Sequence, residues 1–139
     1  MGDSMLVDGI QWALERGIEG LTIRHNLLAD NIANVETPGF KRSDVAFKAQ
    51  LAEAMGRDGR RLPLAATHRS HLGRPAGVHD YRPQVFQDSS TTMRADGNNV
   101  DIDREMAELA RNTLEYQALV DVAARRLALL RTAITEGRR

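Results

Sequence analysis

Largely apolar residues near the start of the chain recur every three or four positions. They are Val7, Ile10, Leu14, Ile18, Leu21, His25, Leu28, Ile32 and Val35. Steps of three and four place these side chains along one face of an α-helix. Thr37-Pro38-Gly39 ends the pattern, because proline cannot continue the helical hydrogen bonds and forces the preceding residue out of the helical region. We therefore predict a helix over residues 1–36.

The last third of the chain has the same periodicity. Its members are Met106, Leu109, Thr113, Tyr116, Val120, Ala123, Leu127, Leu130 and Ile134, a seam held over about four heptads. Asp101 or Asp103 can cap the start of this segment, where acidic residues also suit the helix dipole. The pattern predicts a second long helix over residues 101–139.

The segment between these helices, residues 37–100, is rich in glycine and proline. Short strands are predicted near Val78–Tyr81 and Val85–Gln87, and a small helix near Leu51–Met55. The expected fold is therefore mainly α: long terminal helices pair seam on seam as an antiparallel, coiled-coil-like hairpin, with an irregular, partly β middle segment.

Two further features of the helices indicate dependence on neighbouring molecules. A second apolar track on the C-terminal helix would stay in water in a lone hairpin, and it consists of Ala118, Leu119, Val122, Leu129 and Ala133. Gly9, Gly17 and Gly20 each cost about 1 kcal/mol relative to alanine inside a helix. Either the first helix is loosely specified, or its glycines let partner backbones approach closely.

Composition narrows the functional class. With 139 residues the chain has the length of one domain, and its 4% aromatic content is low for a compact enzyme. Nineteen basic and nineteen acidic residues balance, so no overall field attracts nucleic acid or an acidic membrane. The absence of cysteine excludes disulfides, thiol catalysis and zinc–thiolate sites. No run approaches the roughly 20 apolar residues of a membrane span, and Asp3 and Asp8 stand where a cleaved signal peptide carries positive charge.

No pattern in the chain predicts a catalytic, cofactor or metal site. His68, His71 and His79 have no acid at helical spacing and lie among arginines and glycines, so we interpret them as exposed loop residues. The segment Asp88–Thr92 lacks a nucleophile elbow and is typical of a turn. No glycine-rich stretch ends in the Gly-Lys-Ser/Thr of a phosphate-binding loop, and the acids at 101, 103 and 105 are not followed by the glycine and distal glutamate of a calcium-binding EF-hand loop.

Two alternatives of other classes need consideration. Residues 51–95 contain seven arginines and four acids, which motivates an arginine-rich helical dimer that binds nucleic acid. Zero net charge and the lack of aromatic stacking residues near those arginines argue against it. A small cell-wall hydrolase would need a pair of carboxylates in a cleft, and the sequence offers no candidate pair.

A long motif then points to a known family. The segment Asn26–Arg42 reads NLLADNIANVETPGFKR. It resembles the N-terminal signature of the bacterial flagellar rod and hook axial proteins, in which an Asn-Ile-Ala-Asn stretch precedes Thr-Pro-Gly, an aromatic residue and a base. A second segment, Asp96–Met106, followed by Leu109-Ala110 and Tyr116-Gln117-Ala118, resembles the C-terminal part of the proximal rod members.

The resemblance implies a structural subunit of the flagellar basal-body rod, without enzymatic activity. It implies polymerisation through the terminal helices, transmission of torque and lining of the export channel. Partners would be further copies, other rod proteins and the inner-membrane ring or export-gate adaptor, with no nucleic acid or small-molecule substrate. It also implies export to the periplasmic rod by the flagellar type III apparatus without a cleaved signal.

The motif residues suggest physical roles. Asn31 and Asn34 share a helix face, and buried amides there would set the register between helices, although Asn34 could instead cap the helix end. Pro38-Gly39 suits the central pair of a type II turn, with Phe40 packing beside it. The expected assembly interface comprises Ile18, Leu21, Leu28, Asn31, Ile32, Asn34, Pro38, Gly39, Phe40, Met106, Leu109, Tyr116, Val120, Leu127, Leu130 and Ile134.

Overall fold

The computed structural model describes residues 2–55, 82–90 and 94–136. In chain order its elements are α1 (Gly2–Ala33), β1 (Ser43–Val45), α2 (Lys48–Ala54), β2 (Val85–Gln87) and α3 (Ile102–Glu136). Two long helices therefore dominate the molecule, and the prediction of a mainly α fold with paired terminal helices is confirmed.

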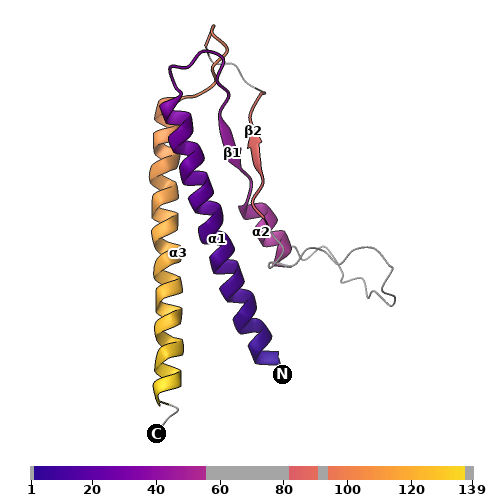
Figure 1. Cartoon of the computed structure of the whole chain (residues 1–139), viewed down its shortest axis with the longest axis vertical. Coiled ribbons are helices and arrows are strands. Elements are labelled where there is room, and N and C mark those ends of the chain that lie inside the picture. The colour runs from indigo at the N-terminus through magenta and orange to yellow at the C-terminus, as the bar shows by residue number, and fades with distance from the viewer. Residues whose placement is uncertain (1, 56–81, 91–93, 137–139) are drawn as a thin grey trace, which may run out of the picture.

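The two long helices run antiparallel and side by side (Figure 1). They lie close together where α1 ends and α3 begins, and they diverge toward the N-terminus of α1. The pair of short strands and α2 form an arm that lies beside α1 (Figure 1) and also reaches α3, because Arg42, just before β1, pairs with Glu105 and Lys48 of α2 pairs with Glu115. Helix α1 therefore packs on both α3 and the strand–helix arm, and the arm also bonds to α3.

The end of the hairpin where the helices converge is closed by local hydrogen bonds. Asp101 caps α3, because its Oδ1 accepts from the backbone N–H groups of Asp103 at 3.0 Å and Arg104 at 3.3 Å. Across from it, the Asn98 side-chain amide donates to the carbonyls of residues 34, 35 and 37, in the turn that follows α1. These bonds tie the end of one helix to the segment that begins the other.

The turn after α1 has the predicted geometry. Phe40 N–H donates to the Thr37 carbonyl at 3.3 Å, and Gly39 has φ of 72°. A residue with a side chain is strained at such a φ, so glycine at the third position is what a type II turn requires. Gly39 N–H also donates to the carbonyl of Asp96, which holds the turn against the chain that leads into α3.

The middle segment folds partly as expected. β1 and β2 pair antiparallel with Asp44 opposite Phe86, and β2 occupies the predicted residues. α2 begins at Lys48, three residues before the expected start. β1 was not foreseen, because three residues that include an aspartate are too short to display alternation. The predicted strand near Val78–Tyr81 lies outside the described residues.

A small apolar core joins the arm to α1. Leu21, Val45 and Phe47 are buried together, and Ile23, Leu27, Leu51 and Leu119 pack against them. A Cβ at Gly20 would lie 2.6 Å from Cδ2 of Phe47, so glycine is needed for the ring to sit on the helix. A Cβ at Gly9 would meet nothing within 4 Å. At Gly20 the close approach is made by a ring of the same chain rather than by a partner backbone.

The prediction that the two apolar seams bury each other was wrong for α3. On α3 the face toward α1, β1 and α2 carries Glu105, Glu108, Asn112, Glu115 and Leu119, one position before the predicted seam. One residue along a helix is a rotation of about 100°. Polar residues take this face because Arg42, Arg24 and Lys48, together with the α1 backbone, supply partners for them. The apolar seam is consequently turned aside: Leu109, Thr113 and Ala123 are half-buried, and the other seam residues are exposed.

Candidate assembly site

The core of the hairpin's closed end is a buried polar cluster, which we define as Asn31, Arg42, Asn99 and Glu105. All four residues are at most 6% exposed, and Glu105 and Asn31 are fully buried. One carboxylate oxygen of Glu105 accepts from Arg42 Nε at 2.8 Å, and the other accepts from Asn31 Nδ2 at 2.9 Å. A single carboxylate on α3 therefore fixes α1 and the residue that precedes β1.

Asn31 links three elements. Besides Glu105, its Nδ2 reaches the Ser43 carbonyl at 2.8 Å, and its Oδ1 accepts from Ser43 N–H at 2.9 Å. Asn34 behaves differently: its Nδ2 donates to the Asp30 carbonyl one turn back, and its Oδ1 accepts from the Thr37 hydroxyl. The buried amide thus aligns elements, while the half-buried one organises the local helix end.

Arg42 and Asn99 extend the cluster to β2. The backbone N–H of Arg42 donates to Asn99 Oδ1 at 2.8 Å, and Asn99 Nδ2 donates to the Asp88 carbonyl at 2.7 Å. Arg42 and Asn31 come from the first motif, and Asn99 and Glu105 from the second. The two segments that carried the family resemblance are therefore two halves of one buried cluster, which no local pattern in the sequence could reveal.

A chain of ion pairs continues from the cluster along the groove between α1 and β1. Asp44 accepts from Arg42 and from Arg24, each at 3.2 Å, and Arg24 also reaches Glu108 on α3 at 3.2 Å. Burial by itself raises the pKa of Asp44, but the Val45 N–H and the two guanidinium groups outweigh it and hold that pKa below its ordinary value. Asp44 is therefore a carboxylate at neutral pH.

The energetic meaning of this cluster follows from its burial. Removing two charges from water costs several kcal/mol per ion, roughly what their attraction returns, so a buried pair adds little net stability. Removing one partner is costly, because a buried charge is then left alone. We infer that the cluster mainly sets the alignment of α1, β1 and α3, since only one register satisfies every partner.

The outer surface of α3 has the opposite character. Its large exposed apolar side chains are Ile102, Met106, Leu114, Tyr116, Val120, Val122, Leu127, Leu129, Leu130 and Ile134. From position 120 to position 136 no residue of α3 is buried. Most helices of a folded domain turn their apolar side inward. In α3 Glu105 and Asn112 are buried against the rest of the chain, whereas most of the large apolar side chains face solvent.

The residues of the expected interface fall into three groups. Leu21, Leu28 and Asn31 are buried within the chain, where they join its own elements. The half-buried residues are Ile18, Ile32, Asn34, Phe40 and Leu109. Those exposed to solvent are Pro38, Gly39, Met106, Tyr116, Val120, Leu127, Leu130 and Ile134. Of the second apolar track, Leu119 packs on the core, whereas Val122 and Leu129 are exposed.

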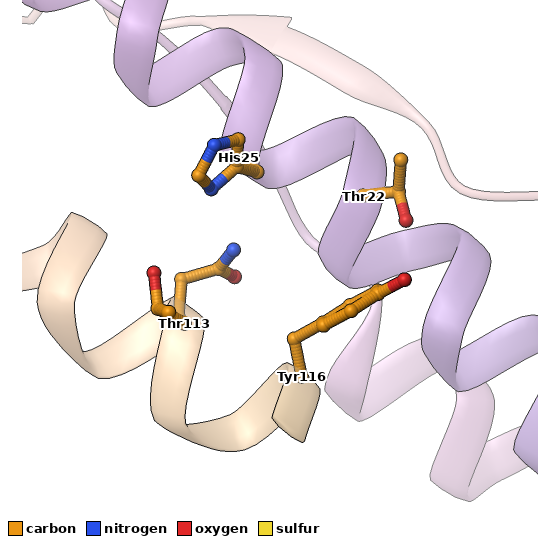
Figure 2. Close-up of a pocket in the computed structure, with 5 residues that line it drawn as sticks. Thr22, His25, Thr113 and Tyr116 are labelled. Carbon is orange, nitrogen blue, oxygen red and sulfur yellow. The ribbon is translucent and has the colours of Figure 1, made fainter. Parts of the chain in front are cut away.

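A pocket of about 260 Å³ opens between the two helices. Figure 2 shows Thr22 and His25 of α1 facing Thr113 and Tyr116 of α3 across it. Asn112 also lines the pocket, and its Nδ2 donates to the Leu21 carbonyl at 3.0 Å. Within the described residues no group donates to its buried Oδ1, so this acceptor is unsatisfied in the single chain.

The described part of the chain also bears on a membrane span, a metal site and nucleic-acid binding. Neither long helix there is apolar and long enough to cross a bilayer. No three histidine, cysteine, aspartate or glutamate side chains gather as a metal site within residues 2–55, 82–90 and 94–136. His68, His71 and His79, and five of the seven arginines behind the nucleic-acid alternative, lie outside these ranges. Arg94 bonds to the Val35 carbonyl and to Glu36.

Curated relatives of the chain are flagellar rod proteins. A flagellar basal body rod protein of Bacillus subtilis is 32% identical over 133 residues, which is 96% of this chain and 98% of the relative. Relatives from Borreliella burgdorferi (36% over 112 residues, 78% of this chain and 83% of the relative) and Cereibacter sphaeroides (39% over 111 residues, 80% and 82%) carry the same description. No family model matches the chain.

Fold and relatives together define a structural protein of the flagellar basal-body rod. All three relatives are named FlgB, and the chain belongs to the FlgB family.

Proposed function

We propose that this rod protein polymerises through the outward apolar face of α3. The observation that carries the proposal is the inverted polarity of this helix. Glu105, Glu108 and Glu115 pair with the chain's own arginines and lysine, Asn112 donates to the backbone, and the large apolar side chains of the helix lie in water. Burying one leucine or isoleucine contributes about 1.5–3 kcal/mol. Neighbouring subunits that covered this face would gain that contribution several times over.

The closed end of the hairpin supports a mechanical role. The polar cluster joins α1, β1 and α3 through directional bonds in one register, so force applied to α3 would pass to α1 and the arm without a change of alignment. A subunit that transmits torque needs such a joint. We therefore propose that α3 makes the contacts between subunits and that the cluster keeps each subunit rigid.

A stripe of small and polar residues along α3 would suit the lining of an export channel. Gln117, Asp121, Ala128 and Thr132 are exposed and recur at helical spacing, and with Arg125 they form a small and polar stripe between apolar ones. In a tube of lengthwise helices this stripe would face the lumen, while the apolar stripes on either side contact neighbours. The partners of the whole subunit would be sibling rod proteins and, at the rod base, the inner-membrane ring or export gate.

The experiment compares two charge insertions on the same helix. Leu127→Glu/Ile134→Glu places two carboxylates on the apolar face, and Gln117→Glu/Thr132→Glu places two on the polar stripe. We expect the first variant to lose self-association in sedimentation velocity and to fail to restore swimming to cells that lack the rod protein. The second should keep both properties. Equal behaviour of the two variants would refute assembly through this face.

The export route has its own test. Export without a cleaved signal predicts that the protein recovered from purified basal bodies retains the mass of the full chain, apart from the initiator methionine. Intact-mass spectrometry measures this directly. A shorter N-terminus in the assembled protein would show that a leader is removed.

A further inference from the structure

The pocket between α1 and α3 lies at one end of a longer apolar stripe. One of its walls is Tyr116, and Val120, Leu127, Leu130 and Ile134 follow Tyr116 along the same side of α3. We name these four residues the distal stripe. All four are exposed, and α1 diverges from α3 at this level (Figure 1). The chain therefore has an apolar stripe without a partner and, further up the same side, a hollow without an occupant.

We propose that the distal stripe of a second copy seats in the pocket, with Leu130 as the side chain that enters it. The inference rests on the proposed function, because it names the contact through which copies would assemble. Four side chains from two helices, Thr22, His25, Thr113 and Tyr116, surround the hollow (Figure 2). A third helix lying in the groove between two others inserts a side chain into such a hole.

Charge distribution favours a second copy as the occupant. α1 contains five acidic residues and two arginines. Both arginines are engaged within the chain, Arg16 by Glu19 and Arg24 by Asp44 and Glu108. Residues 120–136 contain three arginines and two acids, and Arg125 and Arg131 are exposed beside the distal stripe. The end of α3 is thus weakly basic, and α1, which forms the other wall of the pocket, has a net negative charge along its length, although none of the five residues that line the pocket is acidic.

The pocket is also incomplete in the single chain. Oδ1 of Asn112 is buried and receives no hydrogen bond from the described residues, and the exposed rim carries an imidazole and a threonine hydroxyl. Arg131 follows Leu130 directly, so a copy that inserts Leu130 brings a guanidinium to this polar rim. The occupant that we propose therefore matches both parts of the site. Its apolar side chain fills the hollow, and its guanidinium donates hydrogen bonds to the polar rim.

The absence of cysteine from the sequence allows a direct test by disulfide cross-linking. His25→Cys in one tagged batch of full-length protein is mixed with Leu130→Cys in an untagged batch, and the mixture is oxidised with copper–phenanthroline. Asn26→Cys and Leu129→Cys are matched controls, because both positions are exposed and each is one residue, or about 100° of helix, away from the proposed contact. Circular dichroism of each variant checks that the hairpin is intact.

We expect the 25–130 mixed disulfide to form at least tenfold faster than the 26–130 or 25–129 disulfide, and Arg131→Glu in the Leu130→Cys chain to slow it. Equal rates for all three pairs, or a 130–130 disulfide as the main product, would overturn the proposed contact. Sedimentation of the unmodified protein separates the two proposals. Large assemblies that form without a preference for the 25–130 disulfide would support polymerisation and refute this contact. A protein that stays monomeric at high concentration refutes polymerisation itself.

Discussion

The two ends of the hairpin have opposite construction. At the closed end, Asn31, Arg42 and Glu105 are buried and bonded to one another, and the Asn98 amide caps α1. At the open end, residues 120–136 of α3 contain no buried residue and expose large apolar side chains. The closed end therefore buries a group of polar side chains, and the open end leaves large apolar ones in water. The closed end is thus held together by bonds within a single molecule, whereas the open end leaves apolar side chains in water, and it is there that we propose other subunits bind.

The largest effect should come from breaking the closed end. Arg42→Met leaves the carboxylate of Glu105 buried without its cation, and we expect a loss of about 3–5 kcal/mol in the free energy of unfolding. Urea denaturation followed by circular dichroism measures it. Lys48→Met is the control, because Lys48 is half exposed in its pair with Glu115 and such pairs contribute about 0–1 kcal/mol.

The double variant Arg42→Met/Glu105→Met sharpens this prediction. If the cluster mainly sets alignment, replacing both charges by apolar side chains should cost far less than the single change. A double variant as unstable as Arg42→Met would contradict that interpretation.

The next effect concerns the contact between the arm and α1. In Gly20→Ala the new Cβ would lie 2.6 Å from the Phe47 ring, so the ring or the helix must shift. We expect a loss of about 1–3 kcal/mol despite the better helix propensity of alanine. Gly9→Ala is the matched control toward the open end. It meets nothing within 4 Å and should stabilise the chain by about 0.5–1 kcal/mol. If both variants proved equally stable, the close packing of Phe47 would be in doubt.

A smaller effect should appear in the pH dependence of stability. The pKa of Asp44 is lower in the folded chain than its ordinary value of 3.8, so below about pH 5 the unfolded state binds more protons. Stability should therefore be constant near neutral pH and fall as the solution is acidified through the unfolded and then the folded pKa. Asp44→Asn should flatten this decline when the urea midpoint is measured at successive pH values. An unchanged acid limb would show that other carboxylates cause it.

The smallest effect on the isolated chain should come from the open end. Leu127 is 56% exposed, and Leu127→Ala should change the free energy of unfolding of the monomer by no more than about 0.5 kcal/mol. Leu28 is fully buried at the closed end, and Leu28→Ala should cost about 2–5 kcal/mol. Chemical denaturation of dilute protein measures both. A large loss from Leu127→Ala would mean that the open end packs within one molecule.

The sequence alone determined both long helices, the turn at Pro38-Gly39 and the family, because each depends on residues close together in the chain, and it limited the cap of α3 to Asp101 or Asp103. Only the tertiary structure decided which face of α3 turns inward, and this is the face that carries Glu105, Glu108 and Asn112. Apolar periodicity predicts which residues share a face, but the direction of that face depends on partners far away in sequence. Here Arg42 and Arg24 supply charges to Glu105 and Glu108 across 63 and 84 positions, and no pattern within a single helix could indicate them.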